Sequence, residues 1–251
     1  MSSITLGDTP LGYRDLVAVA RDGARLEISA AAWARIANAQ AIVQRIVASG
    51  ERAYGISTGL GALSNVLLHG EQLAQLSRNT LLSHACGVGP LLSEAQTRAI
   101  LVAALANFCQ GYSGLQPKVV EGLQALLNLH ITPCVPSQGS VGYLTHMAHI
   151  SVALLGVGDV RWQGRTLPAS QALAANGLQP LVLGAKDGLC LVNGTPCMTG
   201  LAALALADIE RLADWADVTG AMGFEALKGQ IAAFDADILA LKPHPGMQVV
   251  G

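Results

Sequence analysis

The sequence contains few aromatic and few charged residues. Of its 251 residues only 4% are aromatic and 13% are charged, whereas 51% are hydrophobic. The core therefore has to be built from Ala, Leu and Val, and because Ala and Leu are strong helix formers this composition favours closely packed helices. A charged fraction so far below the usual quarter also predicts that much of the surface is covered by other subunits or by a further segment.

Several features that mark other classes of protein are missing. Lys and Arg (15) nearly balance Asp and Glu (17) and form no basic run, so nucleic acid and acidic membranes are not expected partners. We expect no membrane span, because no uninterrupted apolar stretch is long enough, and Met1-Ser2-Ser3 does not open a signal peptide. The five cysteines are scattered without metal-ligand spacing, which predicts reduced thiols in a cytoplasmic protein.

Apolar periodicity and capping residues predict a mainly α protein. Ser29 is an expected N-cap, Ser93 and Gln96 are an expected capping box, and Pro117 suits a first helical turn. Residues 1–28 are expected to form short strands and turns, and residues 160–167 a hairpin. The expected helices cover about residues 30–49, 71–83, 93–109, 117–129, 144–155, 168–175, 196–215 and 226–241.

Residues 133–149 are the stretch around which the chain is organised. Pro133 and Pro136 make the approach extended and stiff. Gly139-Ser140-Val141-Gly142 then supplies two positions without a Cβ before an apolar helix begins. By itself this is a rigid loop that leads into a helix. A phosphate-binding loop is not supported, because the P-loop spacing and its Lys are absent.

The same stretch resembles the signature of the histidine and phenylalanine ammonia-lyases, Pro-x-x-Pro-x-x-Gly-Ser-Val-Gly followed by Leu-x-x-x-Ala-His. Further segments resemble that family in the same order along the chain, at residues 53–61, 83–87, 186–195 and 224–246. The resemblance implies a mainly α, ammonia-lyase-like helical bundle. It assigns residues 1–195 to a small α+β, loop-rich N-terminal domain and residues 196–251 to the start of a central bundle of long helices.

The family carries Ala-Ser-Gly after Ser-Val-Gly, and these residues cyclise to an electrophilic 4-methylidene-imidazol-5-one (MIO). The resemblance therefore implies an MIO cofactor and no metal. Here the three residues are missing between Gly142 and Tyr143, which would flank the group. Either they are present in a modified form that one-letter code does not represent, or the chain lacks them and is inactive. The retained glycines favour the first explanation, because a loop without cofactor chemistry has no need of them.

The resemblance also implies roles for five other residues. Tyr54 would be the catalytic base, and Asn193 would hydrogen-bond the MIO carbonyl. His84 would bind the substrate ring, with Gly61 and Leu191 as further substrate-binding residues. Taken alone, each has an ordinary structural explanation, such as a packed tyrosine, a turn or a capping histidine.

Some residues near this expected site depart from the family pattern. Tyr143 stands where the family has Asp, and Ser57 and Leu60 replace Asn and Phe in the glycine-rich tyrosine loop. His146 lies in a segment where the family has Pro, and with His149 it forms an i, i+3 pair that could share a helical face. No third ligand is apparent, so we predict no metal site.

These features predict an ammonia-lyase that acts on an aromatic amino acid, in the first place L-histidine, which it would convert to urocanate. An aminomutase on the same scaffold, or a non-catalytic homologue or fragment that serves as a subunit scaffold, is the alternative. The Ala/Leu-rich helices from Pro196 onward need partners to bury them, which predicts a homotetramer. Members of the family are longer, and their second half supplies an Arg and a Glu with no counterpart here.

Overall fold

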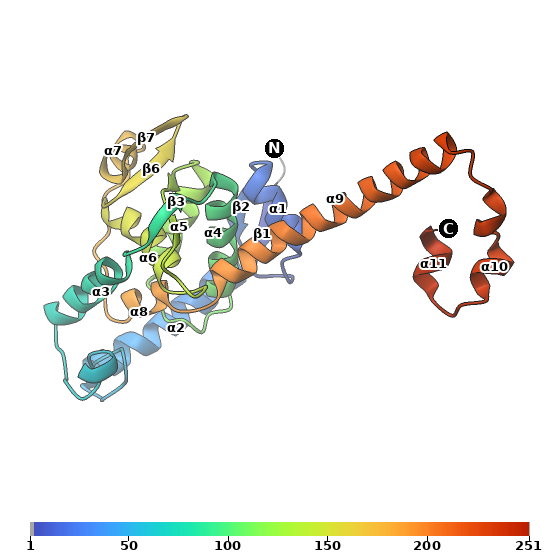
Figure 1. Ribbon diagram of the computed structural model, residues 1–251. Coiled ribbons are helices and arrows are strands. Elements are labelled where there is room, and N and C mark those ends of the chain that lie inside the picture. Colours follow the sequence, from blue (N-terminus) through green and yellow to red (C-terminus); the bar gives the residue numbers. More distant parts are fainter. Residues whose placement is uncertain (1–2, 251) are drawn as a thin grey trace. The chain divides into compact units, whose positions relative to one another are not determined.

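The computed structural model describes residues 3–250 and is mainly α-helical, with short strands in its first part (Figure 1). The strands are β1 (Ser3–Leu6), β2 (Arg25–Ile28), β3 (Val88–Leu91), β4 (Thr132–Pro133), β5 (Pro136–Gln138), β6 (Asp159–Trp162) and β7 (Arg165–Pro168). The α-helices are α1 (Tyr13–Arg21), α2 (Ala30–Ser49), α3 (Glu71–His84), α4 (Glu94–Phe108), α5 (Pro117–Asn128), α6 (Thr145–Val152), α7 (Ala169–Ala175), α8 (Asp187–Val192), α9 (Pro196–Ala226), α10 (Ala236–Ala240) and α11 (Pro245–Val250). Short 3-10 helices cover Gly61–Leu63, Ala153–Leu155 and Ile231–Phe234. The chain forms two compact units that divide after Leu204, within α9.

The first 28 residues contain a helix that the sequence analysis did not predict. β1 and β2 pair in parallel, with Ser3 opposite Arg25, and parallel neighbours need a crossover connection, which is usually a helix. α1 provides that crossover and buries Leu16, Val19 and Ala20. Assigning residues 1–28 to strands and turns alone was therefore wrong, because the parallel pairing could not be foreseen from the local pattern.

The remaining strands form two small antiparallel sheets. β3 pairs with β5, with Val88 opposite Gln138, and β6 pairs with both β4 and β7. The hairpin expected over residues 160–167 is confirmed, and Gln163 and Gly164 form its turn with positive φ angles. The β3–β5 pair ties the segment after α3 to the approach of the central loop.

Most predicted helix ends are confirmed by their caps. The Ser29 side chain accepts a hydrogen bond from the Ala32 N–H, and Ser93 and Gln96 form a capping box at the start of α4. Pro117 occupies the first turn of α5, and Gly50 ends α2 in the left-handed conformation. Capping chemistry is local, which is why the sequence was sufficient to place these boundaries.

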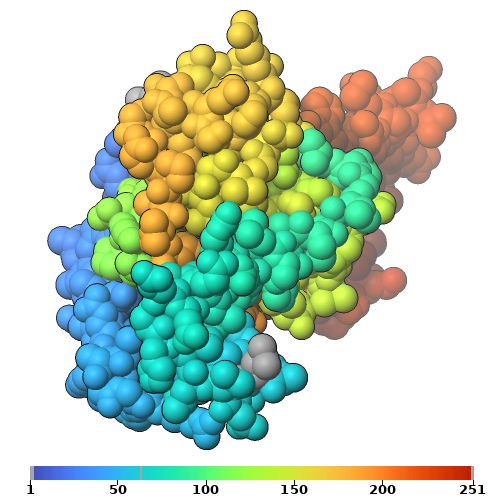
Figure 2. Space-filling view, turned by 90° about the vertical axis from the view of Figure 1, so that its left-hand side faces the viewer, coloured from blue at the N-terminus to red at the C-terminus, as the bar shows by residue number. Residues whose placement is uncertain are grey.

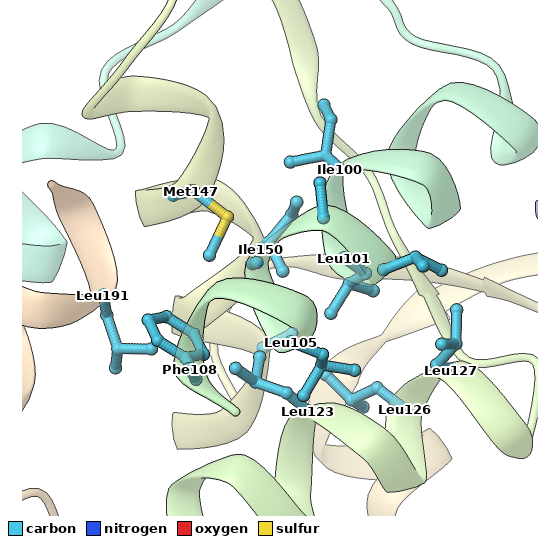
Figure 3. Packing of buried hydrophobic residues seen from close by; sticks show 14 of the residues in the cluster. Ile100, Leu101, Leu105, Phe108, Leu123, Leu126, Leu127, Met147, Ile150 and Leu191 are labelled. Carbon is cyan, nitrogen blue, oxygen red and sulfur yellow. The ribbon is translucent and has the colours of Figure 1, made fainter. Parts of the chain in front are cut away.

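The core of the first unit is built around α4, which is buried on all sides from Thr97 to Leu105. Figure 3 shows apolar side chains from α4, α5, α6 and α8 packed together. The labelled residues are Ile100, Leu101, Leu105, Phe108, Leu123, Leu126, Leu127, Met147, Ile150 and Leu191. Because α6 and α8 share this core, the segments at their ends are held firmly in place.

One buried arginine lies inside this core, and the partners that the described residues offer it are backbone carbonyls. Arg98 of α4 is 5% exposed, and its guanidinium donates to the carbonyls of Val19 (2.7 Å), Ala20 (3.3 Å) and Leu127 (2.8 Å). These carbonyls lie in the last turns of α1 and α5, where backbone acceptors lack partners and a cation is favourable. Burial lowers the pKa of Arg98, and the charge of Glu94 opposes this shift.

The second unit, residues 205–250, corrects another prediction. A helix over residues 226–241 was expected, but α9 ends at Ala226 and is followed by a 3-10 helix and the short α10. The chain turns back at Lys228, where φ is +53°, and Gly229 lies against the Phe224 ring so closely that a Cβ would approach it to 2.2 Å. The Phe224 and Phe234 rings then pack edge to face at 5.2 Å.

The helical run Asp187–Ala226 also corrects an expectation. Among the described residues it alone is long and apolar enough to cross a membrane by length and composition, whereas no such stretch was expected. Of its most apolar window, 44% is buried inside the protein. Core helices of globular proteins pass the same test, so this run is weak support for a membrane span.

Candidate functional site

The central loop runs from β5 to α6 and depends on its glycines. Gly139 and Gly142 have φ angles of +95° and +101°, which side-chain-bearing residues rarely adopt. A Cβ at Gly142 would lie 2.7 Å from the Met198 side chain in the first turn of α9. Thr145 closes the loop by donating from its hydroxyl to the Gly139 carbonyl at 3.2 Å. Close packing therefore requires glycine at position 142.

The peptide between Gly142 and Tyr143, which we call the junction, lies in a strained part of this loop. The Ser140 hydroxyl accepts from the Gly142 N–H (3.2 Å) and donates to the Tyr143 carbonyl (2.5 Å). That carbonyl also accepts from the Thr145 N–H at 3.0 Å, which makes Leu144 the centre of a γ-turn with φ 68° and ψ −77°. This hand of γ-turn is rare and costly for a residue with a side chain. The loop is thus closed at the expense of backbone strain.

Helix α8 holds Asn193 beside this junction. The Leu144 N–H donates to the Val192 carbonyl at 3.0 Å, so Asn193 follows directly on a residue bound to the loop. The Asn193 side chain is exposed and its amide donates to the Leu189 carbonyl at 2.9 Å. No segment had been predicted as helical between residues 186 and 193; α8 forms there, and its first residue is the buried Asp187.

Asp187 explains why α8 stays in place. Its side chain is fully buried and accepts hydrogen bonds from the Gln116 N–H (3.1 Å), the Gln116 amide (2.5 Å) and the Gly184 N–H (2.7 Å). A carboxylate in the first turn also suits the positive end of the helix. On the same helix, burial raises the pKa of Cys190 to about 12, and its thiol donates to the Ser113 carbonyl.

The tyrosine loop, residues 53–61, also packs against α8. Gly55, with φ +66°, approaches Leu189 so closely that a Cβ would lie 2.4 Å from its side chain. Ser57, at the position where the family has Asn, braces the loop by accepting from the Ala53 N–H and donating to the Glu51 carbonyl. Tyr54 itself is 59% exposed, and its hydroxyl oxygen accepts a hydrogen bond from the Gly61 N–H at 3.3 Å. The phenol is therefore accessible and has a backbone donor on its oxygen.

His84 lies in the last turn of α3, half-buried. Its Nδ1 is 2.8 Å from the Thr80 carbonyl and 3.1 Å from the Ser83 hydroxyl. A carbonyl oxygen can only accept, so Nδ1 carries the proton, and in the neutral ring Nε2 is an acceptor. We find no hydrogen-bond partner of Nε2 among residues 3–250, so this nitrogen is available to a ligand. In Figure 2 the loop after α2 and helix α3, in cyan to teal, form a continuous part of one face.

The structure brings some of the expected site residues together and leaves others apart. Leu144, the residue after Tyr143, is hydrogen-bonded to Val192, the residue before Asn193, and the Tyr54 loop reaches the same helix through Leu189. Leu191 is fully buried in the core (Figure 3) and offers no surface to a ligand, so a direct substrate contact is not supported for it. A groove of about 450 Å³ between residues 59–68 and α3 lies elsewhere: none of the expected site residues lines it.

The two histidines of α6 do not face a common ligand. His146 is buried and its Nδ1 lies 3.4 Å from the Cys197 sulfur, whereas Nε2 of His149 accepts from the Gly87 N–H at 2.9 Å. Within the described part of the chain no group of His, Cys, Asp and Glu could hold a metal ion. Sequence reasoning missed these contacts, because the i, i+3 spacing indicates a shared face but not the partners.

The surroundings of the junction fit the MIO group, although the three residues that form it are missing from the sequence. The exposed Asn193 follows Val192, which binds the Leu144 N–H, and Gly142 has no Cβ at the junction. The strain at Leu144 is what a loop shortened between two anchors would show. Gly142, Tyr143 and Asn193 are thus the residues that would hold the group.

The fold and this arrangement agree with the family that the motifs indicated. A model of the family described as aromatic amino acid lyase matches residues 11–251, and the chain belongs to that family. It is 43% identical to a histidine ammonia-lyase of Treponema denticola over 97% of this chain and 48% of the relative. The crystal structure of histidine ammonia-lyase from Trypanosoma cruzi matches with a TM-score of 0.93 and 33% identity, covering 99% of this chain and 49% of that one.

The X-ray structure of a tyrosine aminomutase from Streptomyces globisporus is similar too, with a TM-score of 0.91 and 33% identity over 97% of this chain and 47% of that one. The predicted family and the lyase-like helical fold are confirmed by these matches. The chain spans about half the length of the curated relatives it matches. The domain boundary predicted between residues 195 and 196 stays a prediction.

Proposed function

We propose that this chain is part of an ammonia-lyase that eliminates ammonia from an aromatic amino acid, with L-histidine as the first candidate substrate. The observation that carries the proposal is that two segments pack on α8. The tyrosine loop contacts this helix through Gly55, and the central loop contacts it through Leu144. Similarity to histidine ammonia-lyases supports the reaction class. The relatives named for this activity are about twice as long as this chain, so the activity is proposed for the whole protein.

In the active protein, Ala-Ser-Gly would stand between Gly142 and Tyr143 as the matured MIO group. The group would supply an electrophile for the amine of the substrate. Asn193 would donate its side-chain amide to the carbonyl of the group and so stabilise negative charge there. Its Nδ2 carries two N–H groups, and one of them donates to the Leu189 carbonyl at 2.9 Å, so the other is left for the group.

Tyr54 would take the β-proton of the substrate. A free tyrosine titrates near pH 10, so the phenolate needs stabilisation to act as a base at neutral pH. The Gly61 N–H donates to the phenol oxygen at 3.3 Å and helps to hold the ring in place. Gly61, predicted to bind substrate, would thus act through Tyr54, while the exposed ring leaves the oxygen accessible.

His84 would select the ring of the substrate. With its proton on Nδ1, neutral His84 offers Nε2 as an acceptor, which suits a ring N–H such as that of imidazole. A phenyl ring has no such donor, and a phenol has one at a greater distance from its Cβ. This chemistry favours L-histidine over L-phenylalanine.

An aminomutase is the second candidate function, favoured by the similarity to tyrosine aminomutase structures. It would return the ammonia to the β-carbon, so product analysis separates the two: an α,β-unsaturated acid for a lyase, a β-amino acid for a mutase. A chain that truly lacks Ala-Ser-Gly would be a non-catalytic scaffold. The intact mass decides this, because a mass equal to that of the printed residues alone removes the cofactor.

Exposed apolar side chains along α9 support the predicted homotetramer. Ile209, Leu212, Trp215 and Met222 are each more than half exposed, and patches of this kind usually mark an interface. Light scattering of the full-length protein at micromolar concentration should give four times the subunit mass, and a monomer would contradict the proposal. The cytoplasmic location inferred from the reduced cysteines stays a prediction.

The mechanism is tested with two variants of the full-length protein. Tyr54→Phe should keep the fold and the near-UV absorbance of the prosthetic group, and lose about two to four orders of magnitude in turnover. Asn193→Ala should impair the prosthetic group itself and change that absorbance. Rates are measured on L-histidine, L-phenylalanine and L-tyrosine. Turnover by Tyr54→Phe at the wild-type rate would remove Tyr54 from the mechanism.

A further inference from the structure

A hydrogen bond across the fold joins helix α6 to the segment that follows α3. The Gly87 N–H donates to Nε2 of His149 at 2.9 Å, between residues 62 positions apart in the sequence. Most of α6 is buried, whereas His149 is only partly so. Its imidazole therefore reaches out of the core toward the 85–88 backbone.

The contact leaves no room for another side chain at position 87. A Cβ on Gly87 would lie 3.0 Å from Nε2 of His149 and 3.2 Å from both the Gln138 carbonyl and the Pro136 side chain. Gly139 approaches the same backbone, since its own Cβ would be 3.4 Å from the Gly87 Cα. The segment is thus held between His149 and the strand that leads into the central loop.

This clamped segment carries His84 at its start. His84 ends α3, Ala85 caps the helix, and two residues later Gly87 is fixed by His149. The chain then enters β3, where Val88 pairs with Gln138. The end of α3 and the approach to the central loop are therefore connected at Gly87 and Val88, and His149 supplies the side-chain link.

We propose that His149 is a positioning residue that fixes the 84–87 segment, and with it His84, against the central loop. The role of His84 in substrate binding rests on the proposed function, whereas the fixing of the segment does not. His149 has to accept the Gly87 N–H, so its ring acts in the neutral form with the proton on Nδ1. It touches no substrate and acts through His84.

The test compares two substitutions of similar size in the full-length protein. His149→Gln places an amide oxygen near the position of Nε2, and this oxygen can accept the Gly87 N–H. The thioether of His149→Met is only a weak acceptor. In hydrogen–deuterium exchange, peptides over residues 83–90 should exchange at least about tenfold faster in His149→Met than in wild type, since one anchoring hydrogen bond is lost. His149→Gln should restore most of the protection.

Steady-state kinetics give the second readout. His149→Met should raise KM for the preferred amino acid about threefold to tenfold and change kcat by less than about twofold, because binding by His84 is weakened and Tyr54 is untouched. His149→Gln should return KM toward the wild-type value. Loss of kcat alone, or equal KM in all three proteins, would overturn the proposal.

His146→Met is the matched control, since it removes the other imidazole of α6, which contacts Cys197 and not Gly87. Exchange over residues 83–90 should stay at the wild-type rate in this variant, and faster exchange there would show a general loosening of α6 and refute the assignment. Should His149→Met not fold, Gly87→Ala disturbs the same contact from the opposite side and must give the same faster exchange. If the wild-type enzyme releases ammonia from no amino acid, the proposed function fails, and the exchange measurement still decides the role of His149.

Discussion

Placing Ala-Ser-Gly between Gly142 and Tyr143 should stabilise the fold. In the 251-residue chain the loop closes through a γ-turn at Leu144, with φ 68° and ψ −77°, because Gly139 and Thr145 hold its two ends. Three added residues would let Leu144 return to an allowed conformation. The reverse experiment uses a protein that carries the three residues. Deleting them should lower its free energy of unfolding.

The size of the effect follows from two opposing terms. A side-chain-bearing residue in such a conformation costs about 1–3 kcal/mol. Lengthening the loop between Gly139 and Thr145 from five residues to eight costs about 0.4 kcal/mol, because closure entropy grows as (3/2)RT ln n. The free energy of unfolding should therefore rise by about 0.5–2.5 kcal/mol.

Urea unfolding followed by circular dichroism measures this difference. The midpoint should move to higher urea without a change in slope, since the area exposed on unfolding stays nearly the same. Ala-Ala-Gly at the same place should give a similar shift, which separates relief of strain from cofactor formation. The control is Ala-Ser-Gly after Gly177, a surface turn where a Cβ would meet nothing within 4 Å. An unchanged or lower midpoint for insertion at the junction, or an equal rise for the control, would refute the reasoning.

Further predictions concern buried polar groups. Arg98→Met should lower the free energy of unfolding by about 2–5 kcal/mol, because three carbonyls at the ends of α1 and α5 lose their donor; Arg98→Lys should recover only part of this in the same urea assay. Burial raises the pKa of Cys190 to about 12, so at pH 7.5 iodoacetamide should modify the exposed Cys86 and leave Cys190 unmodified until the protein unfolds, as peptide mass spectrometry can check. Burial, and to a lesser extent the charge of His146, lower the pKa of His149 below its value in the unfolded chain, so the folded protein favours the neutral ring. The stability that this contributes is fully present above about pH 6.5 and should be lost as the pH falls further. His149→Gln should therefore lose less free energy of unfolding between pH 7 and pH 5 than the wild type.

Local chemistry was enough to predict many elements from the sequence. The Ser29 cap of α2, the capping box of Ser93 and Gln96, and the hairpin over residues 160–167 were all predicted. Each of them depends on neighbours within a few positions of the chain. The predictions were wrong at two places. α1 is required by the parallel pairing of β1 with β2, which is a long-range contact. The break after Ala226 is local, but it includes a positive φ at Lys228, which this residue type does not indicate.

The sequence by itself determined the family and the identity of the candidate groups, because motif residues in a fixed order are visible without coordinates. Only the tertiary structure decided what those groups touch. It buried Leu191 in the core, gave His146 and His149 separate partners, and set the tautomer of His84 through the Thr80 carbonyl. It also located the strain at Leu144. The burial of Leu191 and the partners of His146 and His149 depend on distances between segments far apart in the chain, and no spacing along one strand or helix contains them.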